Sequence, residues 1–123
     1  MKLLFLLVFL GGLVFARAQN DSANYETGIA SFYAKKFEGR KCSSGCTFRN
    51  DSLTAAHKSL KFGTRVKVTN LRNDSVVIVT INDRLPQRSK RSIDLTRKAA
   101  AQLNFIPKGL AKVKIEVLKD PIP

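Results

Sequence analysis

The chain has 123 residues and a formal net charge of +13, with 22 lysines and arginines against nine aspartates and glutamates. This length excludes a large multidomain enzyme and allows one small domain with a modest core. The charge favours an anionic partner: nucleic acid inside a cell, or an anionic envelope polymer or membrane surface outside it. Solubility alone is the alternative explanation.

Residues 1–18 predict a secretory signal peptide. Lys2 precedes a long apolar run, and Ala16-Arg17-Ala18 has the pattern of a cleavage site. The run is too short for a comfortable transmembrane helix, so no transmembrane segment is expected. We predict cleavage near Ala18 and a soluble periplasmic or secreted protein, which argues against nucleic acid as the partner.

The exported chain is predicted to start with a flexible leader at residues 19–26, which are polar, followed by one domain over residues 27–119. Residues 27–34 are rich in β-branched and aromatic side chains and predict the first strand. Residues 35–51 lack periodicity and predict a long loop, and a long loop in a small domain is more often functional than idle.

Cys42 and Cys46 lie in this loop with C-x3-C spacing. In an exported chain a disulfide is the expected pairing, and the glycine and serines between them supply a turn. No metal is expected, because two cysteines and one histidine do not fill a four-ligand zinc site. No cofactor motif is present: the chain lacks phosphate-loop and dinucleotide-binding patterns.

The second half of the chain alternates between strand and turn patterns. Residues 53–57 fit either a short strand or one helical turn, and Asn73-Asp74 predicts a hairpin. Residues 76–81 (VVIVTI) are continuously apolar and predict a central strand buried on both faces. Half-buried strands are predicted at 65–71 and 111–118, and a helix at 95–104. Four or five strands and one helix predict a small barrel or sandwich.

Three residues stand out as candidate catalytic groups, each with a structural alternative. Asp94 precedes the predicted helix, where aspartate is a favoured N-cap. Asp83 follows an apolar run, so it is either a structural partner of Arg84 or a carboxyl group whose pKa burial raises. His57 is the only histidine, and it is either a satisfied structural group or a catalyst.

The ordered segments of the chain resemble the rare lipoprotein A (RlpA-like) family, of the septal-ring lytic transglycosylase type. They are GIASFYA, SGCTF, LTAAHKSLKFGTRVKVTN, VIVTINDRLP, SIDLTRKAAAQL and VKIEVL, which together cover about residues 28–118. The resemblance implies a mainly β fold, a six-stranded double-psi β-barrel with one or two short helices. It also implies a remote relation to expansins and family-45 glycoside hydrolases.

The resemblance further implies an enzyme that acts on peptidoglycan glycan strands. Such an enzyme cleaves between N-acetylmuramic acid and N-acetylglucosamine without water and leaves a 1,6-anhydro end. One carboxylic acid can protonate the leaving oxygen and then help deprotonate the C6 hydroxyl, unlike the two-carboxylate hydrolases. No stable protein partner is expected.

Carried over to this chain, the catalytic residues are His57 of TAAH, Asp83 of INDR and Asp94 of IDL. The expansin-like comparison favours Asp94 as the general acid, and the RlpA-like comparison favours His57 with Asp83. Substrate-binding residues are expected among the basic and aromatic groups nearby, namely Tyr33, Arg84 and Arg91.

One departure from the family is central. The family's loop reads T-A-S-G-E-x-F, and its glutamate is a candidate acid, whereas Cys46 occupies that position here. A thiol or a disulfide sulfur does not replace a carboxylic acid as proton donor. The alternative function is therefore a non-catalytic wall-binding or expansin-like loosening module.

Overall fold

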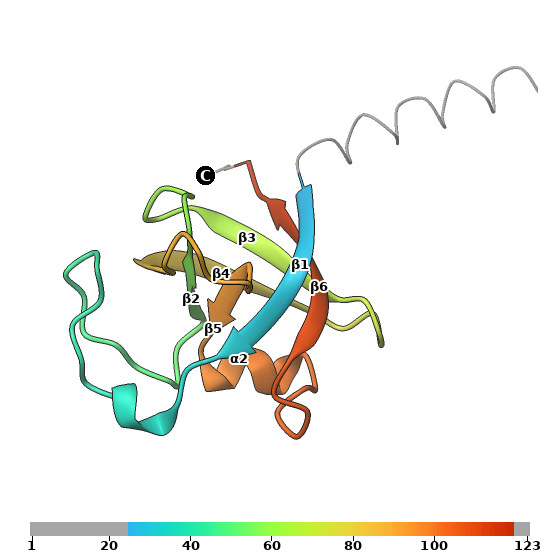
Figure 1. The fold of residues 1–123 in the computed structure, drawn as a ribbon, viewed down its shortest axis with the longest axis horizontal. Helices are drawn as coiled ribbons and strands as arrows, with labels where there is room; N and C mark the ends of the chain where they lie inside the picture. The colour runs from blue at the N-terminus through green and yellow to red at the C-terminus, as the bar shows by residue number, and fades with distance from the viewer. Residues whose placement is uncertain (1–24, 120–123) are drawn as a thin grey trace, which may run out of the picture.

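The computed structural model describes residues 25–119, and six strands in this range form a closed barrel (Figure 1). Around the barrel the strands follow the order β1-β5-β2-β4-β3-β6. The pairs β1–β5 and β2–β4 are parallel and the other four are antiparallel. This arrangement confirms the predicted six-stranded, mainly β double-psi barrel. The strands are β1 (Tyr25–Phe32), β2 (Thr54–His57), β3 (Arg65–Asn70), β4 (Val76–Arg84), β5 (Ile93–Leu95) and β6 (Ala111–Val117).

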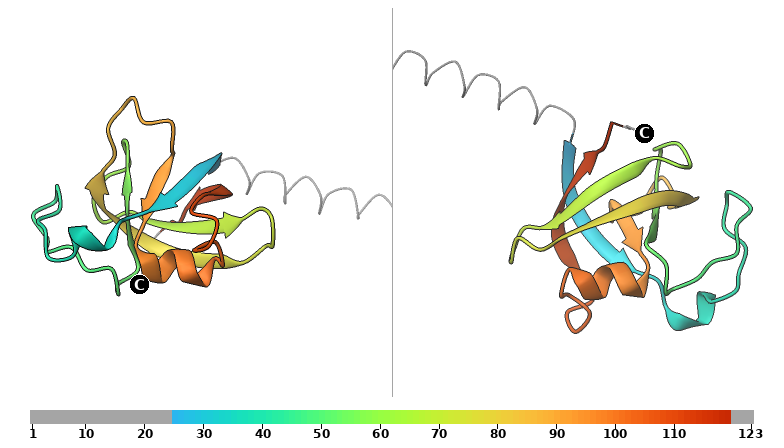
Figure 2. Two further views of the ribbon diagram at one scale, coloured as in Figure 1. Left: turned by 60° about the horizontal axis from the view of Figure 1, so that its bottom comes forward. Right: turned by 180° about the vertical axis from the view of Figure 1, so that it is seen from behind.

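The core fills the inside of the barrel because every second residue of each strand points inward. The inner positions carry branched apolar residues, such as Val66 and Val68 on β3 and Val113 and Ile115 on β6, all at most 1% exposed. The helix α2 (Arg97–Gln102) lies across one end of the barrel (Figures 1 and 2). The core also includes Ala99 and Ala100 of this helix, together with Leu103 and Phe105, which follow it.

The long loop after β1 contains one turn of 3-10 helix, η1 (Lys35–Phe37), and projects to one side of the barrel (Figure 1). The predicted hairpin at Asn73-Asp74 is confirmed, since β3 and β4 pair antiparallel on either side of it. Asp74 has φ 63°, a conformation that aspartate tolerates in turns.

The prediction that β4 is buried on both faces is wrong. Val76 and Ile78 are 43% and 41% exposed, whereas Val77 and Val79 are buried. The first four residues of β4 are all apolar, but only the inner face of the strand meets the core. An apolar run cannot by itself distinguish a strand covered on both faces from one covered on a single face.

The proposed role of Asp94 as helix cap is also wrong. Thr96 is the N-cap of α2, and its hydroxyl oxygen accepts a hydrogen bond from the Ala99 amide at 3.3 Å. Asp94 lies in β5, two residues before the cap. Both residue types are favoured at N-caps, so composition alone did not decide between them.

Several strand boundaries differ from prediction: β1 ends at Phe32 instead of residue 34, and β4 continues to Arg84 instead of ending at residue 81. The predicted leader ended at Glu26, but β1 begins at Tyr25, since Tyr25 and Glu26 pair with Glu116 and Ile115 of β6. The three-residue strand β5 was not predicted, because three residues are too few to show periodicity. The predicted signal peptide and residues 19–24 lie outside the described residues. Within residues 25–119, no helix has the length and apolar composition that crossing a membrane requires.

Gly28 of β1 lies against the segment that leads into β5. A Cβ atom at this position would meet the Ser92 Oγ at 1.9 Å and the Ser92 Cβ at 2.7 Å. We predict that Gly28→Ala lowers the free energy of unfolding by about 1–3 kcal/mol, the usual cost of overpacking. Urea unfolding would measure it.

Ser92→Gly provides the matched rescue, because both clashing atoms belong to the Ser92 side chain. In the Gly28→Ala background it should recover most of the lost stability. Equal stability of Gly28→Ala and the unmodified chain would contradict this account of the β1–β5 contact.

Candidate active site

A row of paired residues crosses the outer face of the barrel. Ala56 of β2 pairs with Asp83 of β4 on one side and with Asp94 of β5 on the other, and Asp94 pairs in turn with Ser31 of β1. Residues directly opposite one another in a sheet share a face. The two carboxylates therefore flank Ala56, and their backbones are about 10 Å apart, which is two strand spacings.

Local sequence explains why both carboxylates point outward. Asp94 lies between Ile93 and Leu95, which are both fully buried in the core, so strand alternation directs it to the other face. On β4, the pairing with β2 shifts register between Ala55 and Ala56. This irregularity leaves Asn82 unpaired with β2 and brings Asp83 opposite Ala56, which is the usual effect of a β-bulge.

Asp94 is a carboxyl group whose pKa is raised. Burial raises it by penalising the charged form. A hydrogen bond from the Ser31 hydroxyl, at 2.9 Å, and the positive charge of Arg91 oppose this effect, and the negative charge of Asp83 adds to it. The net direction is upward, so Asp94 holds its proton to higher pH than an ordinary aspartic acid.

The pKa of Asp83 shifts in the opposite direction. Burial raises its pKa, but hydrogen bonds outweigh that effect and lower it overall. The Tyr33 hydroxyl donates to Oδ2 at 2.5 Å, and the amides of Ser43 and Arg84 donate to Oδ1 at 2.8 and 3.0 Å. Donors aimed at a carboxylate favour its charged form. Burial, together with this hydrogen bond, raises the pKa of Tyr33 well above its ordinary value, so Tyr33 stays a donor.

The two aspartates line one cleft of about 410 Å³. All three predicted substrate-binding residues, Tyr33, Arg84 and Arg91, also line it. Its walls combine aromatic and basic side chains with two apolar residues after β4. The remaining lining residues are Phe37, Arg40, Lys41, Phe48, Leu85 and Pro86.

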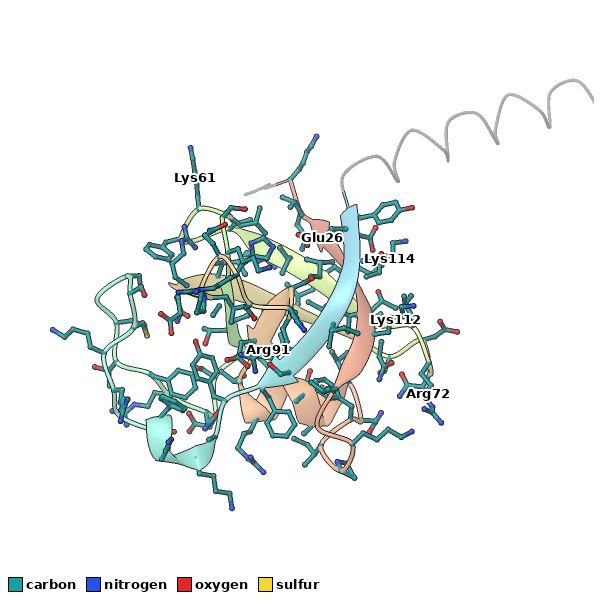
Figure 3. All side chains as sticks on the ribbon, viewed as in Figure 1. Glu26, Lys61, Arg72, Arg91, Lys112 and Lys114 are labelled. Atoms are coloured by element: carbon teal, nitrogen blue, oxygen red, sulfur yellow. A yellow bond between two sulfur atoms is a disulfide. The ribbon has the colours of Figure 1, made fainter. Side chains whose placement is uncertain are left out.

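His57 does not line this cleft. It is 5% exposed, and it pairs with Ile93, so its side chain lies on the inner side of the barrel wall. Its Nε2 lies 2.8 Å from Glu26 Oε1, and its Nδ1 accepts from the amides of Ser59 and Leu60 at 3.1 and 3.2 Å. Since Nδ1 is an acceptor, Nε2 carries the proton and donates to Glu26. Figure 3 labels Glu26, near the start of β1, and Arg91, which belongs to the segment that precedes β5.

The guanidinium of Arg84 does not form the expected structural pair with Asp83. It lies over the Phe62 ring, 4.2 Å from its centroid, and donates to the His57 carbonyl at 3.3 Å. Only the backbone amide of Arg84 reaches the Asp83 side chain. The charge of Arg84 thus borders the cleft without neutralising the carboxylate directly.

Cys42 and Cys46 form a disulfide with their Cα atoms 5.0 Å apart. Cys46 Sγ also accepts a hydrogen bond from Asn82 Nδ2 at 3.3 Å, next to Asp83 in sequence. A disulfide sulfur therefore contacts the residue that directly precedes Asp83 on β4.

Sequence reasoning missed Ser31 and the amide of Ser43, which contact Asp94 and Asp83 respectively. Ser31 lies in the segment GIASFYA, but nothing in that segment marks its serine as a site residue. Ser31 contacts Asp94 only because β1 pairs with β5 across 63 positions of sequence. Ser43 contributes a backbone group, which every non-proline residue carries, so no signal in the sequence marked it.

Comparison with known proteins gives consistent matches. The sequence profile of the family described as "Lytic transglycolase" matches residues 25–115. The Haemophilus influenzae endolytic peptidoglycan transglycosylase RlpA is 44% identical over 103 residues, 83% of this chain and 36% of that protein. The probable RlpA of a Nostoc species is 53% identical over 93 residues, 74% of this chain and 25% of that protein. The chain thus spans well under half of these relatives.

Solved structures share the fold at low sequence identity. The Streptomyces papain inhibitor superimposes with a TM-score of 0.64 at 19% identity, over 79% of this chain and 96% of that chain. A Clavibacter michiganensis expansin superimposes with a TM-score of 0.61 at 19% identity, over 80% of this chain and 52% of that one. These two likenesses concern the barrel alone. The family match runs from the start of β1 into β6 and includes the whole cleft, and the chain belongs to the lytic transglycolase family.

Proposed function

We propose that this chain is an exported lytic transglycosylase that cleaves peptidoglycan glycan strands to 1,6-anhydro ends. The observation that supports this proposal most directly is a pair of aspartates in one cleft whose pKa values shift in opposite directions. Divergent pKa values in neighbouring carboxyl groups are the usual basis for separate acid and base roles. The relatives' names, endolytic peptidoglycan transglycosylase, support the substrate class.

In this proposal Asp94 is the general acid. Its raised pKa favours the protonated form that must donate to the leaving oxygen. As the bond between C1 of N-acetylmuramic acid and O4 of N-acetylglucosamine breaks, the proton of Asp94 passes to O4. The electron pair of the C1–O4 bond stays with that oxygen.

Asp83 is the proposed base. Its three hydrogen-bond donors keep it ionised, and its charge favours the positive character that develops at C1. The C6 hydroxyl of the same muramic acid attacks C1, and its proton passes to Asp83. No water is consumed, so the product carries a 1,6-anhydro bridge. Exchange with solvent then returns both aspartates to their starting states.

The remaining cleft residues would bind the strand. Phe37 and Tyr33 add aromatic surface to the cleft wall, and Arg40, Lys41 and Arg91 attract the carboxylates that peptidoglycan carries on its stem peptides. We assign His57 a supporting role, because its ring nitrogens are engaged with Glu26 and two backbone amides.

Export is part of the proposal, since peptidoglycan lies outside the cytoplasmic membrane. Residues 1–18 have the three regions of a signal peptide. We predict that the exported protein begins at Gln19, which its intact mass would show. Ala18→Arg removes the small residue that cleavage requires and should leave the leader attached. Exported protein that retains residues 1–18 would contradict the prediction.

The second candidate is a non-catalytic wall-binding module, which the Cys42–Cys46 disulfide favours. By the resemblance, a disulfide sulfur stands at the loop position where the family has a glutamate, and a disulfide sulfur has no proton to donate. The same basic and aromatic cleft could then hold a glycan strand without cutting it. This candidate predicts binding to intact sacculi and no new products.

Digestion of purified sacculi separates the two candidates. We predict release of 1,6-anhydro muropeptides, detected by mass spectrometry. Asp94→Asn and Asp83→Asn should each lower the rate roughly hundredfold or more, the usual contribution of a general acid or base. Neither asparagine can exchange a proton in these roles.

Asp74→Asn is the matched control, because Asp74 is exposed in the hairpin and asparagine tolerates its positive φ. This variant should release product at the unmodified rate. Binding to sacculi without any 1,6-anhydro product, at every protein concentration, would contradict the enzyme and support the wall-binding module.

A further inference from the structure

The disulfide closes a tight turn at the edge of the cleft. The Gly45 amide donates to the Cys42 carbonyl at 2.9 Å, and the Cys42 amide donates to the Cys46 carbonyl at 2.8 Å. Gly45 has φ 96°, which glycine adopts at little cost. The covalent bond thus adds to a hydrogen-bonded turn whose two central residues, Ser43 and Ser44, are exposed.

Two polar contacts join this turn to the end of β4. Asn82 Nδ2 donates to Cys46 Sγ at 3.3 Å, and the Ser43 amide donates to Asp83 Oδ1 at 2.8 Å. The chain beyond the turn is anchored by Phe48, which is 3% exposed and packs against the Tyr33 ring at 4.2 Å between centroids. The turn is therefore held on the barrel at the residues that precede and include the proposed base.

Only one of the donors to Asp83 belongs to its own strand, the amide of Arg84. Tyr33 follows β1, and Ser43 lies on the exposed turn. Holding an exposed turn in one conformation costs conformational entropy for each backbone residue. Without a further constraint, movement of the turn would carry the Ser43 amide away from Asp83. A short covalent ring removes much of that freedom.

We infer that the disulfide-closed turn Cys42–Cys46 is a positioning device that holds the Ser43 amide on the Asp83 carboxylate. The inference rests on the proposed function, in which Asp83 is the base. It gives the disulfide a role in the reaction through the position of the Ser43 amide, and it assigns neither sulfur a contact with the substrate. It also makes the reaction sensitive to dithiols: reduction adds two electrons and two protons to the S–S bond and yields two thiols, while the dithiol becomes a disulfide.

The turn permits a variant that deletes the amide and keeps the disulfide. Ser43 is the second residue of the turn that the Gly45–Cys42 hydrogen bond closes, and neither Ser43 nor Ser44 has a positive φ. Proline is favoured at the second position of such a turn. Ser43→Pro thus removes the N–H donor, and Ser43→Ala, the matched control, removes the hydroxyl and retains the amide.

The test compares the titration of Asp83 in these two variants by carboxyl-carbon NMR. The charged and titratable groups lining the cleft around Asp83 are Tyr33, Arg40, Lys41, Arg84, Arg91 and Asp94, and neither variant alters them. We expect the Asp83 pKa to be about one unit higher in Ser43→Pro than in Ser43→Ala, the effect of one hydrogen bond to a charged group. The acidic limb of the rate of 1,6-anhydro product release should move upward by a similar amount.

Reduction provides an independent arm that needs no substitution in the turn. Dithiothreitol should raise the Asp83 pKa of the unmodified protein and move the acidic limb of the rate in the same direction. The Cys42→Ser/Cys46→Ser variant should already show the shifted values and should not respond to the reagent. This variant separates reduction of the disulfide from other effects of dithiothreitol.

The outcomes distinguish this inference from the proposed function. An Asp83 pKa that is equal in Ser43→Pro and Ser43→Ala, or unchanged by reduction, would overturn the inference even if the protein releases anhydro products. A pKa that responds as expected in a protein that releases no such products would uphold the positioning of Asp83 and reject the enzymatic function.

Discussion

The pairing of β2 with both β4 and β5 is the constraint on which the rest of the site depends. It places Asp83 and Asp94 on either side of Ala56, with a small side chain between them. Residues 85–92 connect β4 to β5 past the His57 end of β2, so β4 runs parallel to β2 and β5 runs antiparallel to it. The register shift at Ala55 and Ala56 then brings Asp83, rather than Asn82, opposite Ala56. The closed barrel therefore determines which polar residues meet in the cleft.

Unequal hydrogen bonding gives two chemically identical side chains, those of Asp83 and Asp94, pKa values that shift in opposite directions. Asp94 receives one hydroxyl donor from Ser31, and burial keeps its pKa raised. Asp83 receives two amides and the Tyr33 hydroxyl, which outweigh burial. The difference originates in the loop after β1, since that loop supplies Tyr33 and Ser43. In the proposed reaction, the loop therefore acts through the proton affinity of Asp83.

Much of the barrel was predictable from the sequence, because alternation marks β3 and β6 directly and the ordered motifs indicate six strands. The contacts within the site were less accessible. A three-residue strand such as β5 carries no periodicity, so Asp94 looked like a helix cap, and only the pairing of β5 with β1 and β2 removes it from that role. His57 belongs to the same motif-bearing strand as Ala56, yet one step along a strand reverses the face. The bulge that exposes Asp83 depends on tertiary pairing and leaves no local signal.

The central claim is that the cleft holds one protonated and one ionised aspartate over a shared range of pH. Carboxyl-carbon NMR of the unmodified protein, with Asp83 and Asp94 assigned through their asparagine variants, measures this directly. The account predicts that Asp94 titrates above the ordinary range of aspartic acid and Asp83 below it, so that between the two midpoints only Asp83 is charged. Coincident midpoints, or the reverse order, would contradict the assignment of acid and base and with it the proposed reaction.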